Sequence, residues 1–272
     1  MNALHLNVAT KGFDTAGFVP GHAEDIDNAS LRKESLPFTV KIVANEADLN
    51  KAVYIRHTAY GRHVPAFAEK LKAPEPLDFD MGTVVLLAES KLDGSPLGTM
   101  RIQTNRHTPL ALEQSVELPD WLQGPSLAEA TRLGVSEGHQ GRLVKTVLFK
   151  AYFLYCQQAG IDWMVITARK PLDRQYDALL FRDVFGAGEF IPMSHVGDIP
   201  HRIMAFEIAT AQSRWSAASH PLYNFIVKTH HVDIDLGDVE LGQEHERIGM
   251  HLPVPITRPF HDLAALGALS KR

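Results

Sequence analysis

The chain has 272 residues, of which 45% are hydrophobic and 22% are charged, a composition typical of a globular protein with a sizeable core. It contains no apolar run of about 20 residues, which a transmembrane helix requires, so we expect no integral membrane segment. The formal net charge of −5 argues against bulk attraction to nucleic acid or to an anionic membrane. A single cysteine, Cys156, excludes an internal disulfide framework, and the N-terminus lacks the pattern of a secretory signal, so we expect a cytoplasmic protein.

The two ends of the chain differ in pattern from its middle. Residues 1–36 mix Gly, Asp, Asn and Ser with little periodicity, and we expect them to form a flexible extension. Residues 37–212 carry regular apolar patterns and should form one domain. Residues 213–272 combine one short helical pattern with polar and proline-containing stretches, which predicts a C-terminal extension packed on or beside the domain.

Alternating and helical apolar patterns predict elements in the order β-α-β-β-β-α-β-α-β. The expected strands span residues 38–43, 83–89, 97–104, 127–135, 162–168 and 202–208, and the expected helices span residues 46–60, 141–159 and 172–185. Asp93-Gly94 predicts a turn that joins the second and third strands in a hairpin. The fold class is therefore α/β (α+β), with a central mixed sheet flanked by helices.

The strand at residues 127–135 and the turn after it suggest a site for acyl transfer. The strand carries Glu129, Thr131 and Arg132, and Gly138-His-Gln-Gly-Arg-Leu then leads into an amphipathic helix. An acid in this place can take a proton from an attacking amine, which must lose its ammonium proton before it can react. The turn and the helix N-terminus offer backbone N–H groups to a phosphate or a thioester oxygen.

These motifs resemble those of acyl-homoserine-lactone autoinducer synthases and the related N-acyl amino acid synthases, which have the GNAT acyltransferase fold with splayed central strands. Glu129-Ala-Thr-Arg-Leu-Gly-Val135 is similar to their Glu-x-(Ser/Thr)-Arg-x-x-Val segment. Gly98-Thr-Met-Arg-Ile-Gln-Thr104 resembles their Gly-x-x-Arg-Leu-x-Thr strand, and Arg56-His-Thr-Ala-Tyr60 resembles their Arg-x-x-x-Phe helix. The ordered set covers about residues 40–208 and is more specific than any one motif.

The resemblance implies Glu129 as the catalytic base and a set of substrate-binding residues: Arg56, Asp78, Asp80, Arg101, Thr131 and Arg132. The family's paired acids have a counterpart in Glu75-Pro-Leu-Asp78-Phe-Asp80, with a shorter spacing. Arg132 either pairs with Glu129 or with the acids at 78 and 80, or binds the carboxylate of the acceptor. A structural salt bridge is the alternative for both Arg132 and Arg56.

The donor should be an acyl-phosphopantetheine thioester, a co-substrate, with no tightly bound cofactor. The residues expected to bind the thioester and the phosphopantetheine are Gly134, Val135, Ser136, Gln140, Arg142 and Lys145. The chain lacks the small residues that close on the pyrophosphate in coenzyme A-dependent GNATs, which favours an acyl carrier protein as donor. A basic cluster at Arg142, Lys145 and Lys150 can contact an acidic carrier helix, or it simply solvates the helix. The tyrosine that serves many GNATs as general acid is missing, unless Tyr176 replaces it.

For the acceptor, we favour a free amino acid over S-adenosylmethionine. Autoinducer synthases have a Trp soon after the Arg-x-x-x-Phe helix, whereas this chain has none before Trp121. An autoinducer synthase and a non-catalytic module that binds an acyl carrier remain the alternatives. We expect no metal site, because His230 and His231 are adjacent in an expected extended segment and so face opposite ways.

Overall fold

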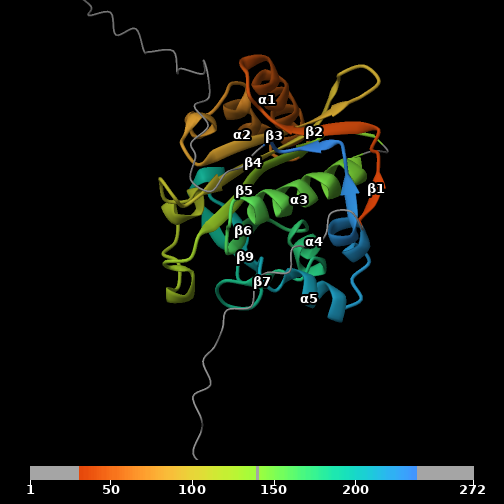
Figure 1. The fold of residues 1–272 in the computed structure, drawn as a ribbon. Helices are drawn as coiled ribbons and strands as arrows, with labels where there is room; N and C mark the ends of the chain where they lie inside the picture. Colours follow the sequence, from red (N-terminus) through yellow and green to blue (C-terminus); the bar gives the residue numbers. More distant parts are fainter. Residues whose placement is uncertain (1–30, 139–140, 238–272) are drawn as a thin grey trace, which may run out of the picture. The chain divides into compact units, whose positions relative to one another are not determined.

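A mixed β-sheet with helices on both faces organises the part of the chain that the computed structural model describes, residues 31–138 and 141–237 (Figure 1). Nine strands of this part form the sheet in the order β11-β2-β3-β4-β5-β6-β9-β7, with β8 paired to β9. These strands are β2 (Phe38–Ile42), β3 (Thr83–Ser90), β4 (Pro96–Thr104), β5 (Leu127–Val135), β6 (Trp163–Ala168), β7 (Arg182–Asp183), β8 (Ile191–Met193), β9 (Ile199–Glu207) and β11 (Ile234–Asp235). The mixed sheet confirms the predicted fold class.

The helices fall between these strands in the predicted order. The α-helices are α1 (Glu46–Gly61), α2 (Pro65–Ala68), α3 (Gly141–Gln158), α4 (Asp173–Ala178) and α5 (Ala211–Ala217). Short 3-10 turns are η2 (Glu69–Leu71), η3 (Pro76–Phe79), η4 (Ala111–Gln114), η5 (Asp120–Leu122) and η6 (Ser194–Val196), and η7 (Asn224–Lys228) is a π-helix. Among the described helices, none combines the length and the apolarity that crossing a membrane requires.

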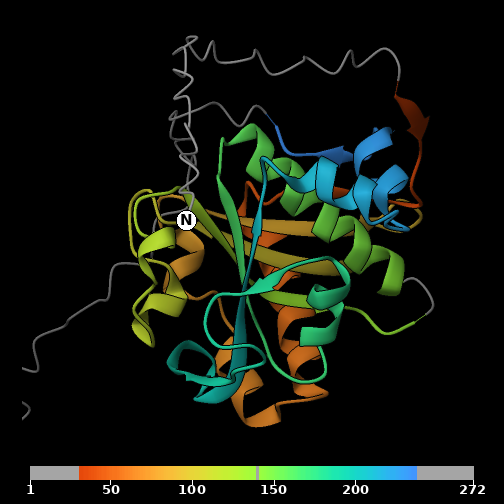
Figure 2. The same cartoon turned by 90° about the horizontal axis from the view of Figure 1, so that it is seen from below.

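Helices α1 and α3 cover opposite faces of the sheet (Figure 2). The side chains of β3 alternate between these faces, as strand geometry dictates. Val85 and Leu87 pack with Leu49 of α1, whereas Leu86 belongs to the cluster that contains Leu148 of α3. Both faces of this strand are therefore buried, which explains why its sequence is a nearly continuous apolar run.

Strands β5 and β6 are paired over only part of their length. Parallel pairing begins at Leu127 and ends at Ala130, which lies opposite Ile166. From Thr131 to Val135, β5 has register pairs with β4 alone. The two strands therefore separate halfway along β5, which is the splay expected of this fold class.

Helix α4 is about half as long as predicted, so the expected helix at residues 172–185 is wrong in its second half. Leu180 has a φ of 69°, and a bulky residue in this left-handed region cannot continue a right-handed helix. The chain then forms β7, which pairs with β9. Arg202 of β9 fixes this course, because its guanidinium donates to Asp177 at 2.8 Å and to Asp183 at 2.9 Å.

The described residues after β9 return to the core. Strand β10 (Thr229–His231) pairs with β1 (Arg32–Glu34), and β11 pairs with β2, both in parallel. The Lys150 ammonium of α3 donates to the carbonyl oxygens of Phe225 and Thr229 and lies 2.8 Å from Nδ1 of His231. Lys150 is therefore buried, and it does not belong to the surface basic cluster predicted for this helix. The division at residues 1–36, 37–212 and 213–272 stays a prediction.

Candidate active site

A β-bulge in β5 brings the key side chains of this strand to one face. Between the register pairs Arg101–Thr131 and Thr99–Gly134, β5 contains one residue more than β4. The extra length falls at Arg132, which has a φ of 54°. A bulge re-aims the side chain that it carries, so the guanidinium of Arg132 reaches the same buried cluster as Arg101 and Thr131 instead of pointing to the opposite face.

Three arginines from three elements converge on two carboxylates beside this bulge. Arg56 of α1 binds Asp78 with both of its terminal nitrogens, at 2.8 and 2.9 Å. Arg132 binds Glu75 in the same forked way, with both distances 2.7 Å. Arg101 of β4 donates from Nη1 to Glu75 at 3.2 Å and to Asp78 at 3.3 Å. The cluster fixes α1, β4 and β5 relative to the segment at η3.

The positive charge of this cluster controls the protonation of its two acids. Burial opposes ionisation of Glu75, but the hydrogen bond from Arg132 and the charges of the three arginines outweigh it and lower the pKa. The pKa of Asp78 is likewise lowered, because Arg56 and Arg101 outweigh burial. Both acids are therefore carboxylates at neutral pH, and neither is suited to take up a proton in catalysis.

Glu129 lies on the same strand in a different environment. Its side chain is fully buried, and Oε2 accepts a hydrogen bond from the backbone N–H of Leu112 in η4 at 3.1 Å. Oε1 has no hydrogen-bond partner among the described residues. Burial raises the pKa of Glu129 to about 7, because it outweighs the hydrogen bond from Leu112 N–H and the charges of the nearby arginines, which lower the pKa. A carboxyl with this pKa exchanges protons readily near neutral pH.

His195 in η6 is a neighbour of Glu129 that the sequence does not predict. Its Nε2 lies 3.9 Å from Oε1 of Glu129, and its side chain is only 6% exposed. Burial, together with the positive charge of Arg132, lowers the pKa of His195 to about 3, so the ring is neutral. A histidine 66 residues further along the chain, in a three-residue turn, gives no local pattern that could have revealed it.

The structure locates the other predicted substrate residues as follows. Asp78, Arg56, Arg101, Thr131 and Arg132 come together, with Thr131 accepting a hydrogen bond from Arg101 Nε at 3.1 Å. Asp80 takes no part in the described ion pairs of the arginines, and Glu75 provides the second acid instead. Of the alternatives for Arg132, pairing with Glu129, Asp78 or Asp80 is wrong, because Arg132 forms a salt bridge with Glu75.

On the donor side, the strand end at residues 134–136 lies where β5 and β6 have separated. The N–H of Ser136 donates to the Leu97 carbonyl at 2.8 Å, so it is not free to bind an oxyanion. Because paired and unpaired N–H groups alternate along antiparallel strands, the N–H of Val135 points away from β4, toward the splay. Gly134 packs closely on α1, where an added Cβ would lie 3.1 Å from the Cβ of Ala59.

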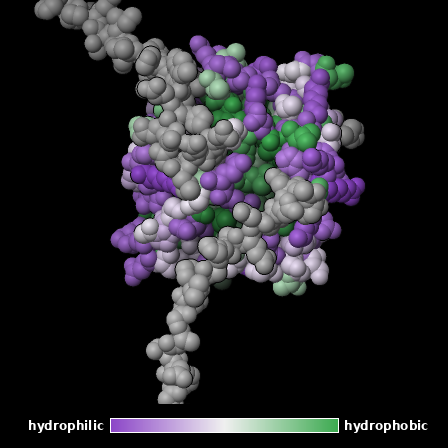
Figure 3. Space-filling view, in the orientation of Figure 1, coloured by the Kyte–Doolittle hydropathy of each residue, from purple (hydrophilic) through white to green (hydrophobic). Residues whose placement is uncertain are grey.

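Helix α3 begins a few residues after this strand end. Arg142 is exposed, and Lys145 donates to the Gln175 side chain of α4 at 2.6 Å. Gln140 lies outside the described residues. Leu143 is 37% exposed. Figure 3 shows the face of the molecule seen in Figure 1, on which hydrophobic surface lies near the middle and hydrophilic surface lies around it. Burial and nearby Tyr60 raise the pKa of Tyr176 to about 12, so its hydroxyl stays protonated.

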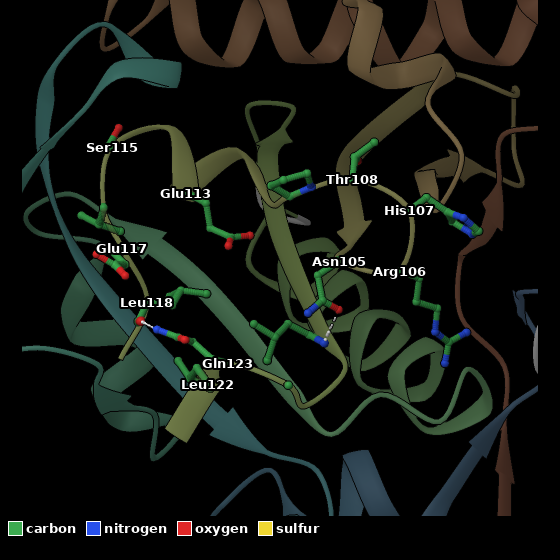
Figure 4. A pocket seen from close by; sticks show the side chains of 14 residues that line it. Asn105, Arg106, His107, Thr108, Glu113, Ser115, Glu117, Leu118, Leu122 and Gln123 are labelled. Carbon is green, nitrogen blue, oxygen red and sulfur yellow. Dashed lines mark hydrogen bonds between the residues drawn. The ribbon is translucent and has the colours of Figure 1, made fainter. Parts of the chain in front are cut away.

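A cavity of about 780 Å³ lies against the segment that connects β4 to β5 (Figure 4). The loop between β4 and β5 forms its wall, with Glu113 and Asn105 among the lining side chains. Glu129, His195 and the three clustered arginines do not line this cavity. We therefore assign the candidate active site to the buried face of β5 and not to this cavity.

Comparison with known proteins identifies the family. The family model of the N-acyl amino acid synthase FeeM matches residues 51–199. The solved structure of FeeM, an N-acyl amino acid synthase from uncultured soil microbes, is similar in fold, with a TM-score of 0.54 and 20% identity over 69% of this chain and 96% of that chain. A coenzyme A-dependent acyl-homoserine lactone synthase, BjaI, solved with SAM and isopentyl-CoA, gives a TM-score of 0.49 and 15% identity over 74% of this chain and 97% of that chain. A search of the curated proteins gives no match. The chain belongs to the FeeM family of N-acyl amino acid synthases and is an acyltransferase.

Proposed function

We propose that the protein moves a long-chain acyl group from an acyl carrier protein to the amino group of an amino acid, with Glu129 as the base. The observation that supports this most directly is the buried carboxyl of Glu129, whose Oε1 is unpaired among the described residues and whose pKa is about 7. In the reaction the amine nitrogen attacks the thioester carbon, and the C–S bond breaks as the amide forms. Glu129 takes the proton that the nitrogen loses, directly or through a water molecule.

The splay between β5 and β6 supports the donor side of the proposal. An extended phosphopantetheine arm can lie beside Thr131 to Val135, where β5 lacks a partner strand on that side. The N–H of Val135 is oriented to stabilise the oxyanion that forms on the thioester oxygen. The leaving thiolate has an ordinary thiol pKa of about 8.5, so it needs little help from an acid.

Carrier protein is the donor we propose, and coenzyme A is the alternative. Arg142 is exposed at the start of α3, with Lys145 one helical turn along, and this pair suits the acidic surface of a carrier. Exposed Leu143 adds an apolar contact between them. Carrier-dependent acylation would take place in the cytoplasm, the location that we propose for the protein.

The direct test is acyl transfer by purified protein to an equimolar mixture of the twenty protein amino acids, read by mass spectrometry. Wild type supplied with hexadecanoyl-carrier protein should form an N-acyl amino acid, and hexadecanoyl-coenzyme A should serve less well. Glu129→Gln should lower kcat by about 10²–10⁴-fold, because a positioned base contributes that much. The kcat/KM of wild type should fall as the pH drops below 7, since Glu129 becomes protonated.

Charge reversal separates the two donors. Arg142→Glu should raise the KM for the carrier-bound donor by a larger factor than the KM for the coenzyme A donor, because the acidic surface of the carrier adds contacts to those of the phosphopantetheine phosphate that both donors share. Formation of acyl-homoserine lactone from S-adenosylmethionine would assign the autoinducer reaction instead. Carrier binding with no acyl product, unaltered in Glu129→Gln, would assign a non-catalytic binding module.

A further inference from the structure

Buried polar atoms without hydrogen-bond partners gather beside Glu129. Among the described residues these include Oε1 of Glu129, both ring nitrogens of His195 and Nη1 of Arg132. The three side chains are neighbours, because His195 Nε2 is 3.9 Å from Glu129 Oε1 and Arg132 Nη2 donates to the His195 carbonyl at 3.1 Å. A buried polar group left unpaired costs about 1–3 kcal/mol, so a group of them indicates a site built for a polar ligand.

The position of the His195 ring is fixed by the turn that carries it. Ser194 is anchored to Ser115 by two contacts of 2.9 Å, from its backbone N–H and from its hydroxyl. Val196 is buried in a hydrophobic cluster, and the guanidinium of Arg132 holds the carbonyl of His195. The ring therefore faces Glu129 because its backbone is held from both sides.

The unpaired atoms complement the head group of an amino acid. A carboxylate oxygen and the lone pair of a neutral imidazole both accept hydrogen bonds, and an amine offers several N–H groups. Two acceptors 3.9 Å apart can both bond to one amine nitrogen, because bonds of about 2.9 Å to each leave the N–H directions close to linear. Nη1 of Arg132 has an N–H left for a carboxylate, although Nε and Nη2 are already used by Glu75.

We propose that His195 is a substrate-binding residue, which holds the amine of the acceptor amino acid beside Glu129 while Arg132 Nη1 binds the carboxylate of the same molecule. This inference rests on the proposed function and adds the position of the acceptor. Because the ring is neutral at pH 7, it accepts a hydrogen bond and does not repel a cationic amine. Its tautomer would be the one with the proton on Nδ1 and the lone pair on Nε2.

Three variants test the role of His195. His195→Leu removes the acceptor at similar size, and His195→Gln restores a polar atom near the Nε2 position. His220→Leu is the matched control, since His220 is a half-buried histidine that bonds to the Ala178 carbonyl at 2.8 Å on a different part of the fold. The amino acid that wild type uses from the mixture of twenty is then titrated against each variant with hexadecanoyl-carrier protein.

We expect His195→Leu to raise the KM for the amino acid at least 10-fold, with the KM for the donor unchanged. His195→Gln should recover most of the loss, and His220→Leu should match wild type in both constants. An unchanged amino acid KM in His195→Leu would overturn the inference and leave the proposed function intact. A rise of equal size in His220→Leu would also overturn it, since the effect would then be general destabilisation.

A binding measurement without donor separates the inference from the proposed function. Saturation-transfer NMR with the twenty amino acids detects binding whether or not acyl transfer occurs. If wild type forms no N-acyl amino acid but binds one that His195→Leu does not bind, the site is supported and the proposed function fails. If wild type neither acylates nor binds any amino acid, both fail.

Discussion

The raised pKa of Glu129 implies that the residue proposed as base destabilises the fold. An acid whose folded pKa exceeds its unfolded value holds its proton more tightly in the native state, so stability falls as pH rises between the two values. For Glu129 these values are about 7 in the fold and 4.5 in the unfolded chain. Glu129→Gln removes the titration, keeps an acceptor for the Leu112 N–H, and should therefore stabilise the protein at pH 8.

The size of this effect follows from the two pKa values. Each factor of ten in the protonation equilibrium is worth about 1.4 kcal/mol, so the interval from 4.5 to about 7 corresponds to roughly 3 kcal/mol. The penalty is absent at pH 4, where both states are protonated, and it is complete at pH 8. The free energy of unfolding of Glu129→Gln should thus equal that of wild type at pH 4 and exceed it by roughly 3 kcal/mol at pH 8.

Urea unfolding at a series of pH values measures this difference, because the titrations common to both proteins cancel. Glu75→Gln provides a control of opposite sign, since the pKa of Glu75 is lowered in the fold. This variant should be less stable than wild type at pH 7, and the deficit should shrink as the pH falls below 4.5, through the folded pKa of Glu75. If the stability of Glu129→Gln follows that of wild type at every pH, the carboxyl is not desolvated as described, and its assignment as a base poised near neutral pH loses its support.

Two further predictions concern the packing of β5 on α1 and the attachment of η7 and β10 to α3. Gly134→Val should lower the free energy of unfolding by about 1–3 kcal/mol through overpacking, because the new Cβ would lie 3.1 Å from the Cβ of Ala59. Gly61→Ala is the control, and it should lower the free energy of unfolding less because its Cβ has room; thermal melts of both variants compare them. Lys150→Met should destabilise the protein by about 1–3 kcal/mol, because the carbonyls of Phe225 and Thr229 lose a buried donor. Amide hydrogen exchange should then accelerate first in η7 and β10, whereas uniform acceleration across the sheet would contradict this local role.

Much of the central fold could be predicted from local pattern. Strand β5 and helix α3 are long, and their apolar periodicity is strong, so their bounds match the prediction to within a residue. The prediction of a helix at residues 172–185 is wrong in its second half, because the positive φ of Leu180 ends the helix. Arg202, on a strand distant in sequence, then binds both Asp177 and Asp183. No local pattern encodes an ion pair of this separation.

The site was predicted in the same uneven way. Glu129, Thr131 and Arg132 share one strand, and a strand pattern can place them. The partner of Arg132 could not be predicted, because the choice between Glu75 and Asp80 depends on how the η3 segment meets three arginines from α1, β4 and β5. Lys150 was misplaced for a similar reason, since its carbonyl partners lie at least 75 residues away.

The bulge at Arg132 also bears on how the enzyme can be re-engineered. One extra residue resets the alternation of β5, so Glu129 and Arg132, which are proposed for the acceptor, lie before the bulge and in it, whereas Val135, which is proposed for the donor, lies after it. The two sets are connected through the backbone of β5. Amino acid preference could therefore be altered by library mutagenesis around η4 and η6, with donor use left as it is, whereas deletion of a single residue at the bulge would change both specificities at once.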